Sequence, residues 1–343
     1  MNSFLKSAGA YIPIKGRIST QDLLKKGDPN KKFPDYVEKK RNSEFSDVEK
    51  KAGIKYRYLA APDKTIADMA SSAIEDIGEL PESRTTGIIL ATSSITSPES
   101  IHELKVDEAA SLLVLKEISK NFGFHAMEVV HEACSGFVGS VVRANEIFSC
   151  PINKINKIIV VAAERILNIV DPNNKNFAPL FGDGAGAVVI SREPSEGSRE
   201  FLGSNYKKID ISEALYRDEN GIMQMPNGKM VYQVAVREMT NMIYALMNKI
   251  GISKEELTLI PHQANSNIVQ DIIDKISPIS SLNIVPFIGN VSSAGIPTAL
   301  SLAQRNYDLR HYIEKIRPNK NLGMTAIGTG GHAYGVLFGP ELA

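Results

Sequence analysis

The sequence predicts a protein of the α/β class, with a largely parallel sheet and helices on both of its faces. Short apolar runs rich in β-branched residues alternate along the chain with longer stretches whose apolar residues recur at helical spacing. This order is typical of a sheet covered on both faces. The chain has 343 residues, of which 43% are hydrophobic, so it can form about two domains or one large duplicated unit.

The first half of the chain is expected to hold an alternating series of strands and helices. We expect strands at 87–91, 128–131, 157–163 and 187–191, and helices at 65–77, 107–118 and 135–148. Residues 31–55 are rich in lysine with interspersed glutamate, which is typical of solvated helix faces. Residues 192–206 are polar and show no apolar period, so we interpret them as a connector.

The second half of the chain repeats this alternation. We expect helices at 230–250, 265–276 and 293–302, and strands at 257–260, 324–327 and 333–338. The halves are similar in element order and length. A structural duplication is consistent with that similarity, although no residue-level repeat accompanies it.

Charge and cysteine content narrow the class of protein. Lysine and arginine number 39, as do aspartate and glutamate, and this balance argues against a general nucleic-acid or anionic-membrane binder. The first residues lack the apolar core of a signal peptide, and the most apolar stretch, 155–170, contains three charges and is too short to span a bilayer. Two cysteines suit a reducing compartment. We therefore expect a cytoplasmic protein with no nucleic-acid and no membrane partner.

Cys134 is a candidate nucleophile because it lies between an expected strand and the helix expected at 135–148. The free N–H groups and dipole at a helix N-terminus favour the thiolate, which is the form that attacks carbonyls. The alternative is a small buried residue, as most free cysteines are, and local context leaves both open. Cys150 lies past a helix end beside Pro151, and we expect no reactive role for it.

Three further segments could line a site. His262 follows the strand expected at 257–260, at the edge of an α/β sheet where ligands bind. Asn290 precedes a Gly- and Ser-rich turn that opens a helix, where an isolated asparagine is most simply an N-cap. The glycine-rich turn 328–335 joins two expected strands and either allows tight packing or presents N–H groups to an anion.

Taken together, these segments resemble the β-ketoacyl-ACP synthase III group of thiolase-fold condensing enzymes, over nearly the whole chain. The matching motifs are Ala52-Gly53-Ile54 with Arg57, ACSGF at 133–137, FGDGAG at 181–186, HQAN at 262–265, NVSSAGIP at 290–297 and Gly330-Gly331. The resemblance implies a thiolase-like duplicated αβαβα five-layer fold and a homodimer. It also implies an N-terminal half, 1–195, that carries Cys134, and a C-terminal half, 196–343, that carries His262 and Asn290.

The resemblance further implies a catalytic triad of Cys134, His262 and Asn290. Cys134 would take an acyl group as a thioester, with backbone N–H groups of Cys134 and Gly330 holding the oxyanion. His262 and Asn290 would then donate hydrogen bonds to an enolate formed from a malonyl- or β-ketoacyl-thioester. A Claisen condensation, decarboxylative with a malonyl donor, would give a β-keto product in fatty-acid or polyketide-type biosynthesis. Thioesters of acyl carrier protein or CoA would be substrates, and no metal or other cofactor would be needed.

Several residues depart from the family pattern. The chain has no tryptophan, and Lys175 stands where an arginine is usual, so a stacked clamp for the CoA adenine cannot form from these residues. This favours a donor on a carrier protein, although Asn267 replaces an arginine that is common near the carrier phosphate. His332 and Tyr334 are expected to change the shape of the pocket. These departures favour a specialised natural-product enzyme.

Glu132, two residues before the nucleophile, occupies a position where small residues are common. It is either a surface or salt-bridged carboxylate, or an accessory base or polar wall near the site. Nearby His131 is more simply a packed strand residue than a catalyst.

These residues leave three other functions open. One is an acyltransferase that forms an ester or amide from acyl-Cys134 without decarboxylation, although two enolate donors would be superfluous there. A second is a non-catalytic partner of a synthase, which has no physical need for Cys134, His262 and Asn290. A third, weaker, alternative is a cysteine hydrolase.

Overall fold

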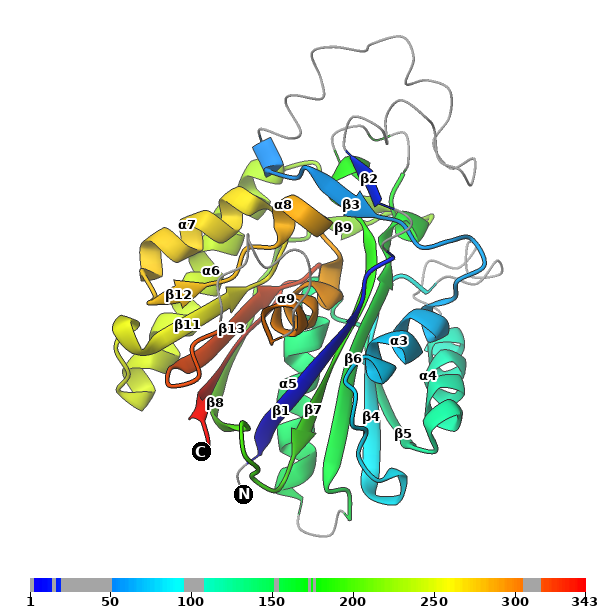
Figure 1. The fold of residues 1–343 in the computed structure, drawn as a ribbon. Coiled ribbons are helices and arrows are strands. Elements are labelled where there is room, and N and C mark those ends of the chain that lie inside the picture. Colours follow the sequence, from blue (N-terminus) through cyan, green and yellow to red (C-terminus); the bar gives the residue numbers. More distant parts are fainter. Residues whose placement is uncertain are drawn as a thin grey trace.

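The computed structural model describes residues 3–13, 17–19, 51–95, 108–150, 154–171, 174, 177–304 and 316–343. Ten strands form one mixed sheet in the order β12-β11-β13-β14-β8-β1-β7-β6-β4-β5 (Figure 1). Most of the charged segment predicted at 31–55 lies outside the described residues, as does Lys175.

The strand order within the sheet repeats. The first half contributes β1 (Phe4–Tyr11), β4 (Thr86–Ala91), β5 (His125–Val130), β6 (Lys157–Arg165) and β7 (Asp183–Ser191). The second half contributes β8 (Arg199–Lys208), β11 (Leu257–Pro261), β12 (Ser280–Ser281), β13 (Asn321–Ile327) and β14 (His332–Glu341). The order β1-β7-β6-β4-β5 thus matches β8-β14-β13-β11-β12, and β1 meets β8 antiparallel at the centre. The duplication is confirmed. The division at 195/196 falls between β7 and β8 and, as a domain boundary, stays a prediction.

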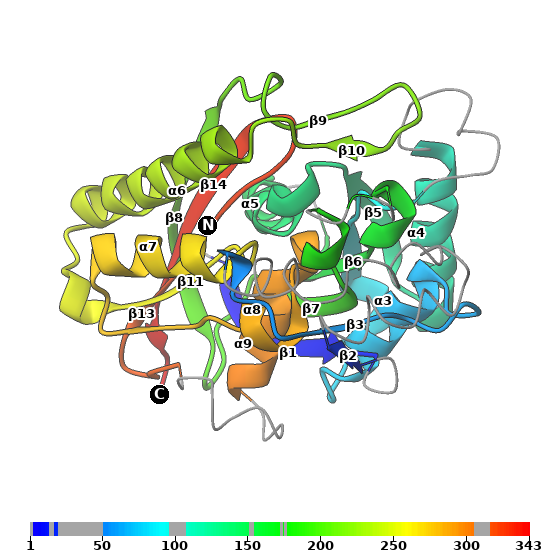
Figure 2. The same cartoon turned by 90° about the horizontal axis from the view of Figure 1, so that it is seen from above.

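Helices surround and separate the two halves of the sheet in five layers. They are α3 (Ile66–Glu75), α4 (Glu108–Phe122), α5 (Gly136–Ser149), α6 (Gly228–Ile250), α7 (Ser266–Ile276), α8 (Val285–Ile288) and α9 (Gly295–Gln304). Helices α3 and α4 cover the outer face of the first half, and α6 and α7 cover that of the second (Figures 1 and 2). Helices α5 and α9 lie between the halves. The implied αβαβα fold is confirmed.

Local sequence accounts for the helix ends. Helix α3 begins at a capping box, in which the Thr65 side chain accepts from the Asp68 N–H and the Asp68 carboxylate accepts from the Thr65 N–H. Its apolar face, with Ile66, Met69 and Ile74, is buried against the sheet. Helix α6 ends at Gly251, whose φ of 81° is readily adopted only by glycine.

Two predictions about the sheet are wrong. The sheet is mixed, because only β4–β5, β4–β6, β11–β12 and β11–β13 pair parallel, while tight hairpins such as β13–β14 force antiparallel pairing. The connector predicted at 192–206 contains most of β8, the first strand of the second half. Strand β8 is only half-buried, so it has no apolar alternation, and backbone pairing with β14 and β1 holds it in place.

Among the described residues, four short strands lie outside the main sheet. They are β2 (Arg17–Ser19) paired with β3 (Tyr56–Tyr58), and β9 (Tyr216–Arg217) paired with β10 (Met223–Gln224). Within the described part of the chain, no helix is both long and apolar enough to cross a membrane.

Candidate active site

Cys134 lies in the turn that leads from β5 into α5. Residues Ala133–Ser135 form a 3₁₀ turn, and Ala133 takes a left-handed backbone with φ of 49°. Gly136 opens α5, and a Cβ there would sit 3.4 Å from the Ala91 Cβ, so the helix starts close against β4. The Ser292 hydroxyl donates to the Cys134 Sγ over 3.6 Å. The prediction that Cys134 lies at a helix N-terminus is confirmed.

His262 follows the carboxyl end of β11. Its backbone N–H donates to the Thr325 carbonyl at 2.8 Å, which continues the pairing of β11 with β13 and fixes the residue in place. The side chain is 2% exposed, and neither ring nitrogen has a hydrogen-bond partner among the described residues. Burial lowers the pKa of His262 to about 4. The imidazole is therefore neutral at pH 7, with one N–H to donate.

Asn290 is held by both its backbone and its side-chain oxygen. Its N–H donates to the Leu180 carbonyl at 2.9 Å, and its own carbonyl accepts from the Gly182 N–H at 3.0 Å. The side-chain Oδ1 accepts from the Ser292 N–H at 2.8 Å, two residues on, which makes an Asx turn. The predicted N-cap is wrong, because the N-cap position of the 3₁₀ turn Ser292–Ala294 is Val291. The Asx turn leaves the amide nitrogen available to donate.

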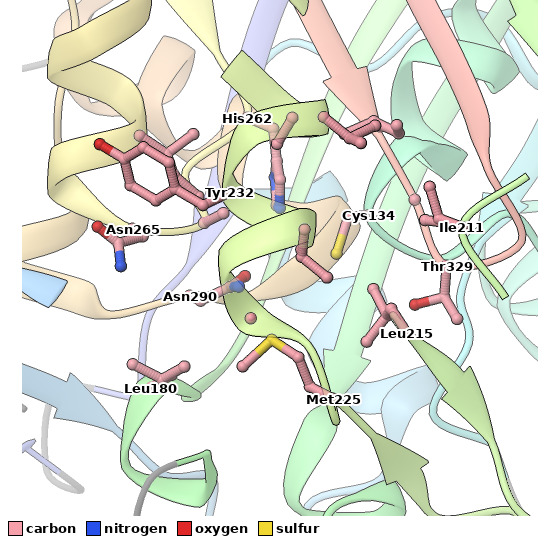
Figure 3. Close-up of a pocket in the computed structure, with 18 of the residues that line it drawn as sticks. Cys134, Leu180, Ile211, Leu215, Met225, Tyr232, His262, Asn265, Asn290 and Thr329 are labelled. Atoms are coloured by element: carbon pink, nitrogen blue, oxygen red, sulfur yellow. The ribbon is translucent and has the colours of Figure 1, made fainter. Parts of the chain in front are cut away.

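One cavity brings Cys134, His262 and Asn290 together (Figure 3). The three side chains come from separate segments and lie on the wall of a space of about 150 Å³. The rest of the wall is mostly apolar and includes Phe177, Leu180, Phe181, Ile211, Leu215, Met223, Met225, Val234, Met239 and Ile268. A few polar groups in an apolar cavity are typical of a ligand site.

Tyr232 closes one side of this cavity. Its ring lies on the cavity wall together with Asn265, and its hydroxyl donates to the Asp271 carboxylate of α7 at 2.7 Å. The wall therefore depends on a contact between α6 and α7.

The ionisation of Cys134 differs from the sequence prediction. Burial raises the pKa of the Cys134 thiol to about 11, and the nearby Glu164 charge adds to the rise. The Ser292 hydroxyl and a backbone N–H act in the opposite direction but do not offset it. The prediction of a favoured thiolate is wrong for this state, because loss of water outweighs the helix N-terminus.

Glu132 does not share the cavity with Cys134. Its carboxylate lies against a second cavity, where the Tyr334 hydroxyl donates to it at 3.1 Å and the His332 Nδ1 lies 3.5 Å away. The predicted accessory base or polar wall beside the nucleophile is therefore not found, and Glu132 belongs to a cluster on the other side of the turn. His131 Nδ1 bonds to the Thr92 carbonyl at 3.0 Å, which fits a packed strand residue.

The glycine-rich turn 328–331 meets the site through its first residues. Gly328 and Thr329 line the cavity of Cys134, whereas Gly330 lines an adjoining cavity that also includes Thr329. An oxyanion role for the backbone of Cys134 and Gly330 stays a prediction. Cys150 is exposed at the far end of α5.

Sequence reasoning did not identify Glu164, Ser292 and Ser293 as parts of the site. Ser292 contacts the nucleophile, and the Ser293 hydroxyl donates to the Glu164 carboxylate at 2.6 Å. A signal was present, since Glu164 is a charged residue at the end of the apolar run predicted as a buried strand.

The sequence matches two families. Residues 130–208 match the family described as 3-Oxoacyl-[acyl-carrier-protein (ACP)] synthase III, and residues 247–339 match its C-terminal family. Cys134 falls in the first segment, and His262 and Asn290 fall in the second.

Individual relatives cover nearly all of the chain. The Beta-ketoacyl-[acyl-carrier-protein] synthase III of Aquifex aeolicus is 30% identical over 345 residues, covering 98% of this chain and 99% of the relative. A Beta-ketoacyl-[acyl-carrier-protein] synthase III 2 of Staphylococcus epidermidis is 29% identical over 318 residues, covering 88% and 90%. The crystal structure of 3-oxoacyl-[acyl-carrier-protein] synthase III from Aquifex aeolicus superposes with a TM-score of 0.77 at 27% identity, covering 98% of this chain and 99% of that one.

Proposed function

Because the chain belongs to the β-ketoacyl-[acyl-carrier-protein] synthase III family, we propose that Cys134, His262 and Asn290 carry out its acyl-thioester condensation. The chain is a condensing enzyme of the transferase class. The observation that carries the assignment of roles is the meeting of these three side chains in one mostly apolar cavity.

In the first step, Cys134 exchanges with the donor thioester. The Cys134 Sγ attacks the acyl carbonyl, the bond from that carbonyl to the donor sulfur breaks, and the thiol proton ends on the departing sulfur. Because the pKa of Cys134 is raised to about 11, a base must take this proton as the new bond forms. The neutral imidazole of His262 in the same cavity is suited to pass it on.

In the second step, a malonyl-type thioester loses CO₂, and the electron pair of the broken C–C bond forms an enolate. The His262 N–H and the Asn290 amide donate to the enolate oxygen, and two neutral donors in a dry cavity suit a developing anion. The enolate carbon attacks the acyl-Cys134 carbonyl. The Cys134 sulfur leaves and takes up a proton, and a β-ketoacyl thioester is released. Two such donors favour condensation over acyl transfer to an alcohol or amine.

We propose that the acyl donor arrives on an acyl carrier protein. The chain contains no tryptophan to stack on the CoA adenine. A carrier-bound substrate ends in phosphopantetheine and does not present an adenine. The Asn267 Nδ2 donates one of its two N–H groups to the Lys51 carbonyl at 2.8 Å, and its side chain carries no charge to pair with the carrier phosphate.

We further propose a cytoplasmic homodimer. Strand β5 is the last strand of the ten-stranded sheet and has its other edge unpaired in the described structure. Its first residues, His125 and Ala126, are exposed. An open edge of this kind can pair with a second copy of the chain.

Intact-protein mass spectrometry tests these assignments. The protein is incubated with matched acyl-carrier and acyl-CoA thioesters at equal low-micromolar concentration, and the mass added to the protein is followed over time. Wild-type and Cys150→Ala proteins should gain one acyl group, and Cys134→Ala should gain none. Acylation of Cys134→Ala at the wild-type rate would overturn the mechanism.

The same experiment decides the donor. Stacking of an adenine contributes about 1–3 kcal/mol, so its loss should raise the KM for acyl-CoA by one to two powers of ten relative to an enzyme that keeps the clamp. The loading rates are compared at two ionic strengths, because carrier docking is electrostatic and is screened by salt. We expect faster loading from the carrier than from CoA at both. Equal loading rates from both donors would contradict the carrier proposal and leave the condensation intact.

A further inference from the structure

Glu164, at the carboxyl end of β6, is a fully buried carboxylate inside the molecule. The carboxylate accepts hydrogen bonds from two separate segments. From the first segment it accepts the Ser93 N–H at 3.0 Å, the Ser93 hydroxyl at 3.1 Å, the Ser94 hydroxyl at 2.7 Å and the Thr92 hydroxyl at 3.5 Å. From the second it accepts the Ser293 hydroxyl at 2.6 Å. A buried carboxylate is stable only when donors are fixed around it, so this set is a rigid junction.

Ser293 belongs to the turn that carries two groups of the active site. Its neighbour Ser292 donates its N–H to the Asn290 Oδ1 at 2.8 Å and its hydroxyl to the Cys134 Sγ over 3.6 Å. Ser292 also holds a left-handed backbone with φ of 50°, which is strained for a residue other than glycine. A strained turn needs an external contact to hold it, and the bond from Ser293 to Glu164 supplies one.

A second charge supports the junction from the opposite side. Arg217 of β9 donates to the Ser93 carbonyl, and the charge of Glu164 acts on the Arg217 guanidinium. Arg217 is therefore oriented toward the same Ser93 segment that binds Glu164. The junction joins β6, the segment after β4, β9 and the turn before α9.

We propose that Glu164 is a positioning residue for condensation, which holds the Ser292–Ser293 turn so that the Asn290 amide faces the acyl group on Cys134. The proposal rests on the role given above to Asn290. Glu164 does not line the cavity, so it acts through Ser293 and does not contact the substrate.

The Ser293→Ala variant tests the proposal most directly. It removes only the hydroxyl that Glu164 holds, while Ser93 and Ser94 still satisfy the carboxylate. Acyl loading of Cys134, followed by intact mass, should stay near the wild-type rate. Condensation of pre-loaded enzyme should fall by about 10- to 100-fold, the scale of a displaced catalytic group. Loading and condensation falling equally, or condensation unchanged, would overturn the proposal.

Substitution of Glu164 itself gives a second measurement. In Glu164→Gln the side-chain amide can still bond to the Ser93 N–H and the Ser293 hydroxyl, so condensation should exceed that of Glu164→Ala. Because both residues act through one bond, Ser293→Ala should add little to the defect of Glu164→Ala. Additive defects would contradict a shared role. If Glu164→Ala does not fold, Ser293→Ala and Glu164→Gln still decide the question.

Glu238→Gln is the matched control. Glu238 is a 2% exposed carboxylate on α6 that is paired with Lys207 at 2.9 Å and Arg237 at 2.7 Å, outside the Cys134 cavity. The Glu238→Gln variant should have a changed melting temperature but an unchanged ratio of the loading rate to the condensation rate. Asn290→Ala is measured alongside. If that variant condenses normally, the proposed role of Asn290 fails. If it is defective while Ser293→Ala is normal, only the inference about Glu164 fails.

Discussion

The two halves of the molecule contain the same strand–turn–helix corner but use it differently. In the first half, Ala133 with φ of 49° precedes Cys134, and Gly136 starts α5. In the second half, Ser292 with φ of 50° precedes Ser293, and Gly295 starts α9. Ser293 is therefore the counterpart of Cys134 in the repeat. Cys134 opens into a cavity, whereas Ser293 is 1% exposed and donates to Glu164.

This difference shows that the corner by itself does not make a nucleophile. A left-handed residue followed by a helix N-terminus occurs in both halves, yet only one corner faces space that a substrate could occupy. The surrounding residues determine which corner can reach a substrate. A carboxylate from β6 fills the position beside Ser293, whereas apolar side chains surround an open space beside Cys134. The second corner supports the first by supplying Asn290 and Ser292.

Moving the thiol from the first corner to the second should have the largest effect on acyl loading. The double variant Cys134→Ala, Ser293→Cys keeps a thiol at the equivalent position of the repeat, but that position is sealed by Glu164. We expect no acyl loading in intact-mass measurements, with Cys150→Ala as the loading control. Acylation at residue 293 would show that the two corners are chemically interchangeable.

The division of labour between the halves predicts a smaller, selective loss. Asn290→Ala should still become acylated on Cys134 at the wild-type rate, because the nucleophile and the imidazole of His262 are intact. His262→Ala should become acylated more slowly, because it lacks the base that takes the thiol proton. Condensation should fall by about 10²- to 10³-fold, the scale of losing an oxyanion donor. Loading and turnover are measured separately on the same preparations. If Asn290→Ala loses loading and condensation equally, the Asn290 Oδ1 that accepts from the Ser292 N–H matters more than the donating amide.

The second half also contributes a pH dependence of stability. The folded pKa of His262 is about 4, below the unfolded value of about 6.5, so the unfolded state binds the proton more readily. The neutral His262 contributes about 3 kcal/mol to the free energy of unfolding. This contribution is fully present above pH 6.5 and is lost as the pH falls toward 4. Thermal unfolding at pH 7.5 and pH 5 should show a larger decrease for wild type than for His262→Gln. An equal decrease in both proteins would rule out His262 as the source.

The glycines that open α5 and α9 give the smallest predicted effect. A Cβ at Gly136 would sit at an ordinary 3.4 Å from the Ala91 Cβ, whereas one at Gly295 would lie 3.0 Å from the Gln263 Cβ. Gly136→Ala should be nearly neutral, and Gly295→Ala should destabilise by about 1–2 kcal/mol through overpacking. Denaturant unfolding measures both. A larger loss of stability in Gly136→Ala than in Gly295→Ala would mean that the second corner is the less tightly packed one.

The sequence predicted those elements whose stability is local. Helix α3 has its Thr65 cap, and Cys134, His262 and Asn290 each follow a recognisable strand or precede a helix. Strand β8 was missed because pairing with distant strands, not its own side chains, makes it a strand. No strand was predicted over β1 for the same reason.

The electrostatics of the site could not be predicted from local sequence. A helix N-terminus after Cys134 suggested a thiolate, but the pKa is set by burial and by Glu164, which is brought close only by the fold. The same holds for Glu132, whose direction depends on Tyr334 of β14. Contacts between residues far apart in sequence decide both cases.

The central pair of strands brings the two ends of the described chain together. Phe4 pairs with Glu200 and Glu341 pairs with Arg199, so residues 4 and 341 lie on opposite sides of the same point of β8 (Figure 1). Two strand spacings separate them, about 10 Å. A circularly permuted chain, joined there by a short linker and opened between β7 and β8, would keep every strand pair. The sheet thus determines which strands are neighbours, but it does not require either half to come first in the sequence. Acyl loading by such a permutant would show whether the active site forms with the order of the halves reversed.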